Sequence, residues 1–537
     1  MPPTVRDDAV HRDAGPGRSG AAARPRALPA PSTDPLPPLA VLPVAALACA
    51  TTALLMLTAD RFGYFSDELY FLVAGRYPSW GYADQPPLLP LLAHAIDSAS
   101  HGSLVWLRAP AAAATALGVL TAALTARELG GRRPAQIATA GAYAVSPVML
   151  QMGHLLITAT LDIFLTTFTT WLLVRWVRTR RDGLLILIGL TAAVSLQVKF
   201  LGVAFWAVLL VAVVLAGPRD LLRRPLLWVS ALGALLTAVP GLLWQVRNGW
   251  PQLAMTKVIS QEVAAEGGGQ AGFLPAVLTT AGLVGALLLG YGLWRLLSAR
   301  EVRPYRFLGL TFAGLCAVYL VVHGRPYYVA GLFAVLWAAA ATGLQRLRPT
   351  RPRAWATVVA YAVSAALAVQ LLPVYPVQRL AESSGDWPSS DGLAKESVGW
   401  PDLAASVARV HRELPADQRR RALLITDRYD QAGALDRYGP ALGLPRPYSG
   451  HRGYWYLRRP ADDSAPVVFV GGDARYLRQF FTSVRKRGTV TNRQNVRNLN
   501  WGVPIWVCEG ERRPWRVLWP RFSHLNADSA DDSFPNP

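Results

Sequence analysis

Long apolar stretches separated by short polar connections fill residues 36–375 of the chain. A helix needs about 20 consecutive apolar residues to cross ~30 Å of hydrocarbon, and windows of this length recur. The pattern therefore predicts a polytopic α-helical membrane protein with about 11 transmembrane helices. The predicted spans are 36–58, 105–126, 134–152, 155–174, 183–199, 200–216, 226–246, 273–294, 307–322, 327–344 and 354–373.

The polar regions outside these spans predict three further parts. Residues 1–35 are rich in Pro, Ala and Arg without an apolar period, which is typical of a disordered tail. Residues 376–520 predict an α/β domain, and 521–537 a flexible tail. In the α/β domain, strands are expected at Ala422–Thr426, Val467–Gly471 and Val503–Val507, and helices at Asp402–Leu414 and Asp473–Arg487, with Asp473 as an N-cap.

Composition and charge placement support this organisation. The 537 residues are 52% hydrophobic and 16% charged, which is too apolar for an ordinary soluble enzyme. The net charge of +20 is concentrated in alternate connections, such as the one that holds Arg175, Arg178, Arg180 and Arg181. By the positive-inside rule, these connections face the cytoplasm of a plasma-membrane protein. The N-terminus is then cytoplasmic and the C-terminal domain extracytoplasmic, and no nucleic-acid partner is expected.

The first predicted outer loop, 59–104, carries carboxylates at the membrane surface. Ser66 is a suitable N-cap, and Asp67 and Glu68 would favour the positive end of a helix dipole in the first turn. A capping role alone is the alternative to a functional one. The helix that follows has an apolar face and aromatic neighbours, which predicts an element lying in the membrane interface. Such an element would hold a carboxylate where a lipid head group arrives.

Further charged residues fall at the same predicted face. Asp162 lies within a span, where a charge is costly and usually marks a functional site, with a structural contact as the alternative. Lys199 closes the fifth span, where snorkelling to the interface is the alternative. Arg325 shares a short outer turn with His323, and a guanidinium suits phosphate because it donates several hydrogen bonds at once. With Arg108 at a helix mouth, these residues predict a site for an anionic lipid-linked substrate.

Several motifs carry a resemblance to a known family. They are the Asp67-Glu68 pair, the run Trp80-Gly81-Tyr82-Ala83-Asp84-Gln85-Pro86-Pro87, the run Thr158-Ala159-Thr160-Leu161-Asp162, Lys199, and the turn Gly324–Tyr328. Residues 60–210 thereby resemble the bacterial dolichyl-phosphate-mannose protein mannosyltransferase-like family. That family belongs to the C-type (GT-C) glycosyltransferases, alongside the aminoarabinose-lipid A transferases. Residues 432–434, 438–439 and 449–451, with Tyr454-Trp455, are similar to a bacterial subgroup, and a packed accessory domain is the favoured interpretation of that part.

The resemblance implies a polyprenyl-phosphate-sugar donor, an inverting transfer and a catalytic acid in the first outer loop. Asp67 would be the general base, supported by Glu68. Asp84 and Asp162 would shape the acceptor site or share a divalent cation, Mg²⁺ or Mn²⁺. A base near the acceptor and fixed positive charge near the leaving group are what such a transfer needs. The donor phosphate would be bound by Lys199, Arg325, Arg108 and His323.

Other classes of protein stay open. A lipid or sugar transporter, or flippase, also places charges in the membrane, although the chain lacks the internal repeat that many transporters have. A non-catalytic membrane scaffold that presents residues 376–537 is a third interpretation. Within the enzyme class, the acceptor could be a protein, a lipid or a cell-envelope glycan, and the sugar a hexose or a pentose. The chain has no Gly-rich phosphate loop, which argues against a nucleotide-sugar donor.

Overall fold

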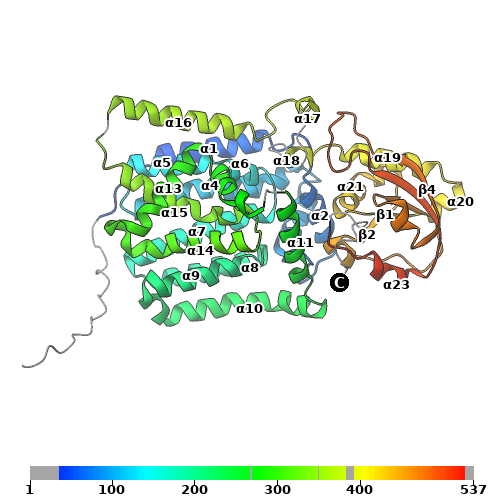
Figure 1. Cartoon of the computed structure of the whole chain (residues 1–537), viewed down its shortest axis with the longest axis horizontal. Helices are drawn as coiled ribbons and strands as arrows, with labels where there is room; N and C mark the ends of the chain where they lie inside the picture. Colours follow the sequence, from blue (N-terminus) through cyan, green and yellow to red (C-terminus); the bar gives the residue numbers. More distant parts are fainter. Residues whose placement is uncertain (1–34, 267–268, 349, 383–391, 527–537) are drawn as a thin grey trace, which may run out of the picture.

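The computed structural model describes residues 35–266, 269–348, 350–382 and 392–526. A helical bundle and a smaller domain built on a β-sheet lie end to end along the longest axis (Figure 1). Residues 1–34 of the predicted N-terminal tail and 527–537 of the predicted C-terminal tail lie outside the described ranges. The predicted fold class, a mostly helical protein with a C-terminal sheet domain, is confirmed at this level.

Helices occupy every range that the sequence predicts to span the membrane. Within the described ranges, five are long and apolar enough to cross a membrane alone: Leu104–Glu128 (α4), Pro225–Arg247 (α10), Arg300–Val321 (η2 and α14), Pro326–Leu344 (η3 and α15) and Arg351–Val369 (α16). The bundle also contains Val41–Leu57 (α1), Arg133–Ala144 (α5), Pro147–Gly153 (α6), Thr158–Thr179 (α7), Gly183–Val198 (α8), Gly202–Ala216 (α9), Gly269–Ala281 (α12) and Leu283–Ser298 (α13). The multi-pass helical character is confirmed, whereas the number of eleven crossings stays a prediction.

The outer helices of the bundle expose apolar side chains. Only 6% of the apolar window of α10 and 11% of that of α16 are buried, against 83% for η3 and α15. α10 and α16 run along opposite flanks of the bundle (Figure 1). Large exposed side chains such as Trp228, Leu236 and Trp355 form faces that are too apolar for an ordinary soluble surface. These faces fit the hydrocarbon of a bilayer.

Two predicted spans are broken helices. Residues 273–294 were expected to form one helix, but α12 and α13 meet at an angle of 112°. Gly282 joins them with φ +81°, a conformation that glycine adopts without steric cost. Residues 134–152 divide into α5 and α6 because Pro147 begins the second helix at its first position, where proline needs no backbone donor.

The C-terminal domain is built on a mixed five-stranded sheet in the order β2-β1-β3-β5-β4. The strands are Leu423–Thr426 (β1), Tyr448–Ser449 (β2), Val467–Val470 (β3), Phe481–Thr489 (β4) and Pro504–Glu511 (β5). β2, β1 and β3 are parallel, and β5 is antiparallel to both of its neighbours. The three strands expected from the sequence are confirmed, as is the helix at 402–414, which is Trp400–Arg412 (α19).

The prediction of a single helix over Asp473–Arg487 is wrong. Asp473 does cap a helix, because its carboxylate accepts the Tyr476 N–H at 2.7 Å, but that helix (α22) ends at Leu477. Residues 481–489 form β4 instead, paired with β5 along its length. The spacing of Leu477, Phe480 and Phe481 is helical, but they reach one core cluster from α22, from the turn after it and from β4. Phe522, in the predicted flexible tail, packs into the same cluster and is 2% exposed.

The helix Ser66–Gly75 (α2) is enclosed rather than lying in the membrane interface. It packs against Leu88–Ala99 (α3) and against Tyr429–Tyr438 (α21) of the sheet domain. Phe65 is its N-cap, in place of the expected Ser66, whose hydroxyl instead donates to Glu396 at 2.9 Å. Every residue of α2 except Asp67 is buried.

Candidate active site

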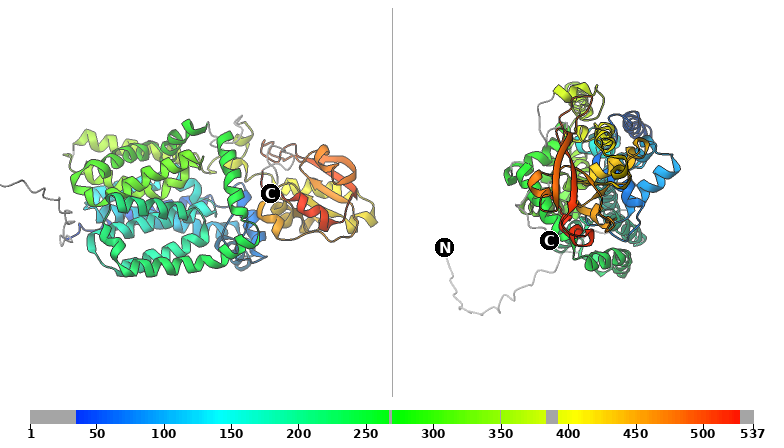
Figure 2. Two further views of the ribbon diagram at one scale, coloured as in Figure 1. Left: turned by 60° about the horizontal axis from the view of Figure 1, so that its bottom comes forward. Right: turned by 90° about the vertical axis from the view of Figure 1, so that its right-hand side faces the viewer.

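A cavity of about 610 Å³ lies where the helical bundle meets the sheet domain. One wall comes from α2 and the loop that follows it, and another from the end of α8 and the turn before η3. The helix Pro251–Glu266 (α11) forms a third wall, standing across the end of the bundle beside the sheet domain (Figure 1, Figure 2). The charged and polar residues that line the cavity include Asp67, Asp84, Lys199, His323, Tyr429 and Arg452.

Asp67 faces this cavity from the first turn of α2. Its Oδ1 accepts a hydrogen bond of 2.7 Å from the hydroxyl of Tyr429, at the start of α21. Burial raises the pKa of the Asp67 carboxyl, while the Tyr429 hydrogen bond and the charges of Arg452 and Arg325 oppose that rise. A carboxylate with a raised pKa in a cavity can exchange a proton with a bound hydroxyl.

Asp84 is the second acid of the cavity. Its Oδ1 accepts a hydrogen bond of 3.1 Å from the hydroxyl of Tyr70, and burial raises the pKa of Asp84 to about 6. Asp67 adds to this rise through its charge, so the two acids are close enough to interact. The backbone of Gly453 reaches this pair: a Cβ there would lie 1.8 Å from the Tyr70 hydroxyl. The sheet domain thus closes tightly over Asp84.

Glu68 and Arg108 do not line the cavity; they pair with each other in the interior. Arg108 Nε donates to Glu68 Oε1 at 2.9 Å and its Nη2 to Oε2 at 2.8 Å, and both side chains are almost fully buried. Glu68 also accepts the N–H groups of Phe65 and Leu156. Arg108 donates further to the carbonyls of Ala59 and Gly63. This geometry gives no support to the expected catalytic support by Glu68 or to phosphate binding by Arg108, and it supports a structural role for both.

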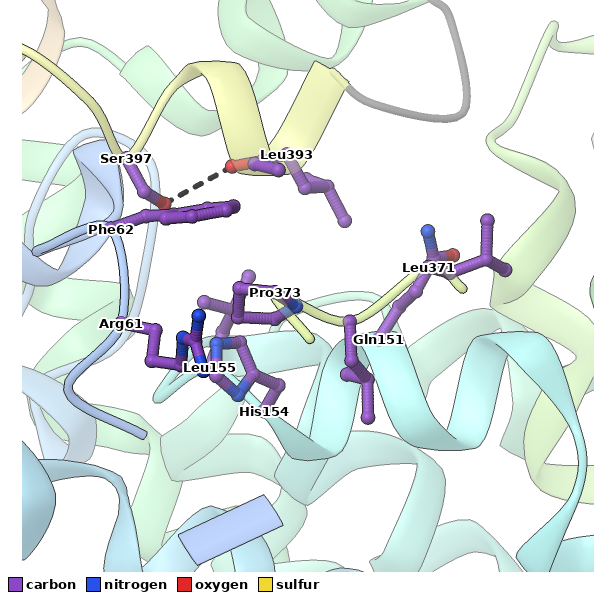
Figure 3. Close-up of a pocket in the computed structure, with 11 residues that line it drawn as sticks. Arg61, Phe62, Gln151, His154, Leu155, Leu371, Pro373, Leu393 and Ser397 are labelled. Carbon is purple, nitrogen blue, oxygen red and sulfur yellow. Dashed lines mark hydrogen bonds between the residues drawn. The ribbon is translucent and has the colours of Figure 1, made fainter. Parts of the chain in front are cut away.

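His154 connects this interior pair to the neighbouring loops. Its ring lies 3.2 Å from Arg108 Nη1 and 3.4 Å from the Thr58 hydroxyl. It lines a second, small cavity of about 20 Å³, with Arg61 and Phe62 on one side and Leu371 and Pro373 on another (Figure 3). This space contains no acid in its lining and is too small for a sugar.

Cations from the helical bundle and from the sheet domain line or border the large cavity. Lys199 ends α8 and places its Nζ 4.4 Å from the ring centroid of Tyr328, a cation–π contact. Arg452 donates to Glu262 of α11 at 2.6 Å, and Arg325 lies 3.6 Å from the other oxygen of the same carboxylate. Two guanidinium groups from distant parts of the chain therefore share one carboxylate beside the cavity.

Asp162 lies apart from Asp84. It lines a small cavity of about 10 Å³ with Thr166 and Tyr319, next to the large one. Among the described residues, no group of three or more His, Cys, Asp or Glu side chains is arranged to hold a metal ion. Asp67 and Asp84 line the large cavity, whereas Asp162 lines the small one, so the sharing of a Mg²⁺ or Mn²⁺ by Asp84 and Asp162 stays a prediction.

The sheet domain contributes site residues that the sequence did not single out. Tyr429 and Arg452 line the cavity, although both lie far from the first loop in sequence. The available signal was the motif at 449–451, which directly precedes Arg452. Packing also explains the glycine of the motif at 432–434, since a Cβ on Gly433 would lie 3.0 Å from the backbone of Leu69. Gly433 lets α21 pack closely on α2, which brings Tyr429 to Asp67.

Acids and cations are thus collected at the end of the helical bundle that meets the sheet domain. Residues 84–244 match the model of the dolichyl-phosphate-mannose-protein mannosyltransferase family. No curated protein matches the chain. The resemblance predicted from the motifs is confirmed by this family match together with the fold.

The fold is similar to that of ArnT from Cupriavidus metallidurans. The crystal structure in the apo state matches with a TM-score of 0.58 and 16% identity, covering 86% of this chain and 97% of that chain. The structure bound to undecaprenyl phosphate matches with a TM-score of 0.55 and 16% identity, covering 87% and 98%. The matched family segment begins after Asp67 and ends before Arg325, Tyr429 and Arg452.

Proposed function

We propose that this protein is an integral-membrane glycosyltransferase that moves a sugar from a polyprenyl-phosphate donor to an extracytoplasmic acceptor hydroxyl. The observation that carries the proposal is Asp67, the one residue of α2 that is only partly buried, facing a cavity that Lys199 and Arg452 also line. ArnT, which shares this fold, has been crystallised with undecaprenyl phosphate, and this supports a lipid-phosphate donor here.

The proposed reaction is a single displacement at the anomeric carbon. Asp67 takes the proton of the acceptor hydroxyl as its oxygen forms a bond to that carbon. The bond between the carbon and the phosphate oxygen breaks, its electron pair stays on the phosphate, and the configuration inverts. Lys199, Arg325 and Arg452 stabilise the negative charge that develops on the departing polyprenyl phosphate. Each step uses groups that line or border one cavity.

Asp84 and Asp162 have separate roles in this proposal. Asp84 would orient the acceptor beside Asp67, because both acids line the large cavity. A bound Mg²⁺ or Mn²⁺ would supply Lewis-acid stabilisation of the phosphate. Asp162 would act on Lys199, since the two side chains interact electrostatically. His323 would contact the donor from the cavity wall, where it lies in the same turn as Arg325.

The proposed orientation follows from the arginine-rich connections. The N-terminus would be cytoplasmic, residues 36–375 would form the transmembrane catalytic domain in the plasma membrane, and residues 376–520 would be extracytoplasmic. Cysteines introduced at exposed positions of the sheet domain should then react with a membrane-impermeant thiol reagent in intact cells. Labelling only after lysis would contradict this orientation.

The test of the function is donor-dependent transfer by purified protein in proteoliposomes. A polyprenyl-phosphate sugar should support transfer to an acceptor, and a nucleotide sugar without a lipid carrier should not. Efficient transfer from the nucleotide sugar would overturn the proposed donor. The alternative, a lipid or sugar flippase, predicts movement of intact lipid-linked sugar across the bilayer with no release of polyprenyl phosphate. Mass spectrometry of envelope glycans and glycoproteins from a deletion strain would identify the acceptor.

A further inference from the structure

We infer that Tyr429 of the sheet domain is a positioning residue for the base Asp67, so that the sheet domain completes the active site. The inference rests on the proposed function of Asp67. It differs from the interpretation of residues 376–520 as a packed accessory domain.

The contact between the two residues is direct and enclosed. The Tyr429 hydroxyl donates to Asp67 Oδ1 at 2.7 Å across a separation of 362 residues, and both side chains line the large cavity. A phenol that donates to one carboxylate oxygen fixes the plane of the carboxylate. With Oδ1 engaged, Oδ2 is the oxygen assigned to take the acceptor proton. Hydrogen bonding also favours the ionised form of the carboxyl, the form that a general base needs.

The ring of Tyr429 is held from two sides. His451 stacks on it with ring centroids 5.0 Å apart and an interplanar angle of 26°, and the Tyr70 ring lies 5.1 Å away. The backbone N–H of Tyr429 donates to His451 Nδ1 at 3.2 Å, which fixes the start of α21 as well. His451 is itself stacked on His524 at 4.8 Å. Tyr429 therefore holds its hydroxyl in place through contacts that do not depend on Asp67.

This arrangement gives the motif at 449–451 a physical role. A Cβ on Gly450 would lie 1.9 Å from the carbonyl oxygen of Phe522, so only glycine allows that close approach. The approach brings the backbone of residues 450–452 beside that of His524 and sets the histidine stack. The stack in turn supports Tyr429. The motif at 449–451 thus helps to hold the Tyr429 hydroxyl at Asp67, through ring stacking and backbone hydrogen bonds.

The deciding experiment compares the pH dependence of transfer in the wild type and in Tyr429→Phe, which keeps the ring and removes the hydroxyl. Loss of the hydrogen bond should move the acidic limb of kcat to higher pH by about 1 unit, lowering the rate about tenfold below that limb and little above it. The donor KM should change little. Charged or titratable groups that also act on Asp67 stay in place in this variant: Arg452, Arg325, Asp430, Asp84 and Glu396.

A matched control is Tyr64→Phe. The Tyr64 hydroxyl donates to the Gly102 carbonyl at 3.1 Å, is buried near the same helix and does not line the cavity. This variant should keep the wild-type pH profile. In addition, Tyr429→Phe should have no further effect in an Asp67→Asn background, since its action passes through Asp67.

A Tyr429→Phe enzyme that loses rate equally at every pH, or that keeps the wild-type profile, would overturn the inference. An additive effect in the Asp67→Asn background would overturn it as well. Failure of the proposed function looks different: the wild-type protein itself would then give no transfer from a polyprenyl-phosphate sugar. Thermal unfolding of each variant in detergent excludes a folding defect as the cause of any change.

Discussion

Two neighbouring carboxylates on α2 point into two different regions of the molecule. Glu68 enters the interior of the bundle, where Arg108 and two backbone N–H groups bind it. Asp67 faces the cavity, where the neutral hydroxyl of Tyr429 donates a hydrogen bond to it. In the interior a guanidinium bonds the acid directly, whereas in the cavity a neutral hydroxyl bonds it and the charges of Arg452 and Arg325 act without a direct hydrogen bond. The comparison teaches that the partner of each acid, and not its place in the motif, distinguishes a structural carboxylate from one that is available for catalysis.

The largest expected effect is on the interior pair. Arg108→Met should lower the free energy of unfolding by about 3–5 kcal/mol, because it leaves Glu68 buried and unpaired. The double variant with Glu68→Gln should regain much of that loss, since no buried charge then remains. Thermal unfolding in detergent measures both. A stable Arg108→Met protein with weakened donor binding would instead support the phosphate-binding role that the sequence suggested.

The next effect concerns the cavity acid. Asp67→Asn should reduce turnover about 10²-fold or more, because the amide cannot accept the acceptor proton. Its stability should change by no more than about 1 kcal/mol, the scale of a first-turn dipole interaction. Asp60→Asn is the control, since Asp60 is an exposed acid just before α2. Near-normal transfer by a correctly inserted Asp67→Asn enzyme would remove Asp67 from the mechanism.

A third prediction uses the pH dependence of stability at Asp84. The pKa of Asp84 is about 6 in the folded state and 3.8 for an ordinary aspartate. Between these pH values the folded state keeps a proton that the unfolded state has released. Wild-type stability should therefore fall as pH rises from about 4 to about 6, and then level off. The difference in Tm between the wild type and Asp84→Asn should change across that window. If the difference in Tm between the two proteins stays constant with pH, the pKa of Asp84 is not raised by burial.

The smallest expected effect is at Ser66, the first residue of the same helix. Ser66→Ala removes its hydrogen bond to Glu396 and should cost about 0.5–1.5 kcal/mol. Burial raises the pKa of Glu396 to about 7, so the loss should be greater above that pH, where the accepting carboxylate is ionised. Ser298→Ala is the control, because the exposed Ser298 hydroxyl donates within its own helix. Equal costs for the two variants would show that Ser66 does not couple α2 to Glu396.

The helices of the bundle and three strands of the sheet could be predicted because apolar period and length are local properties. The break at Gly282 could not, because a glycine within an apolar run does not reveal its backbone angle. The false helix over 473–487 has a similar origin. Leu477 and Phe481 have helical spacing in sequence, yet they belong to a short helix and a strand that share one core.

The candidate site was predictable in part. Asp67, Asp84, Lys199 and His323 all line the cavity, as the shared-face argument required. The pairing of Glu68 with Arg108 was not visible, since two charges 40 residues apart carry no local sign of contact. Tyr429 and Arg452 are likewise positioned by the docking of a distant domain.

The separation of Asp67 and Tyr429 by 362 residues also has a consequence in time. At roughly 5–20 residues per second, a ribosome makes Tyr429 on the order of 20–70 s after Asp67. During that interval the growing protein already holds its first carboxylates among membrane lipids, but the phenol that would orient one of them has not been synthesised. A nascent chain therefore lacks Tyr429 and Arg452, which line the cavity, until about the last fifth of translation.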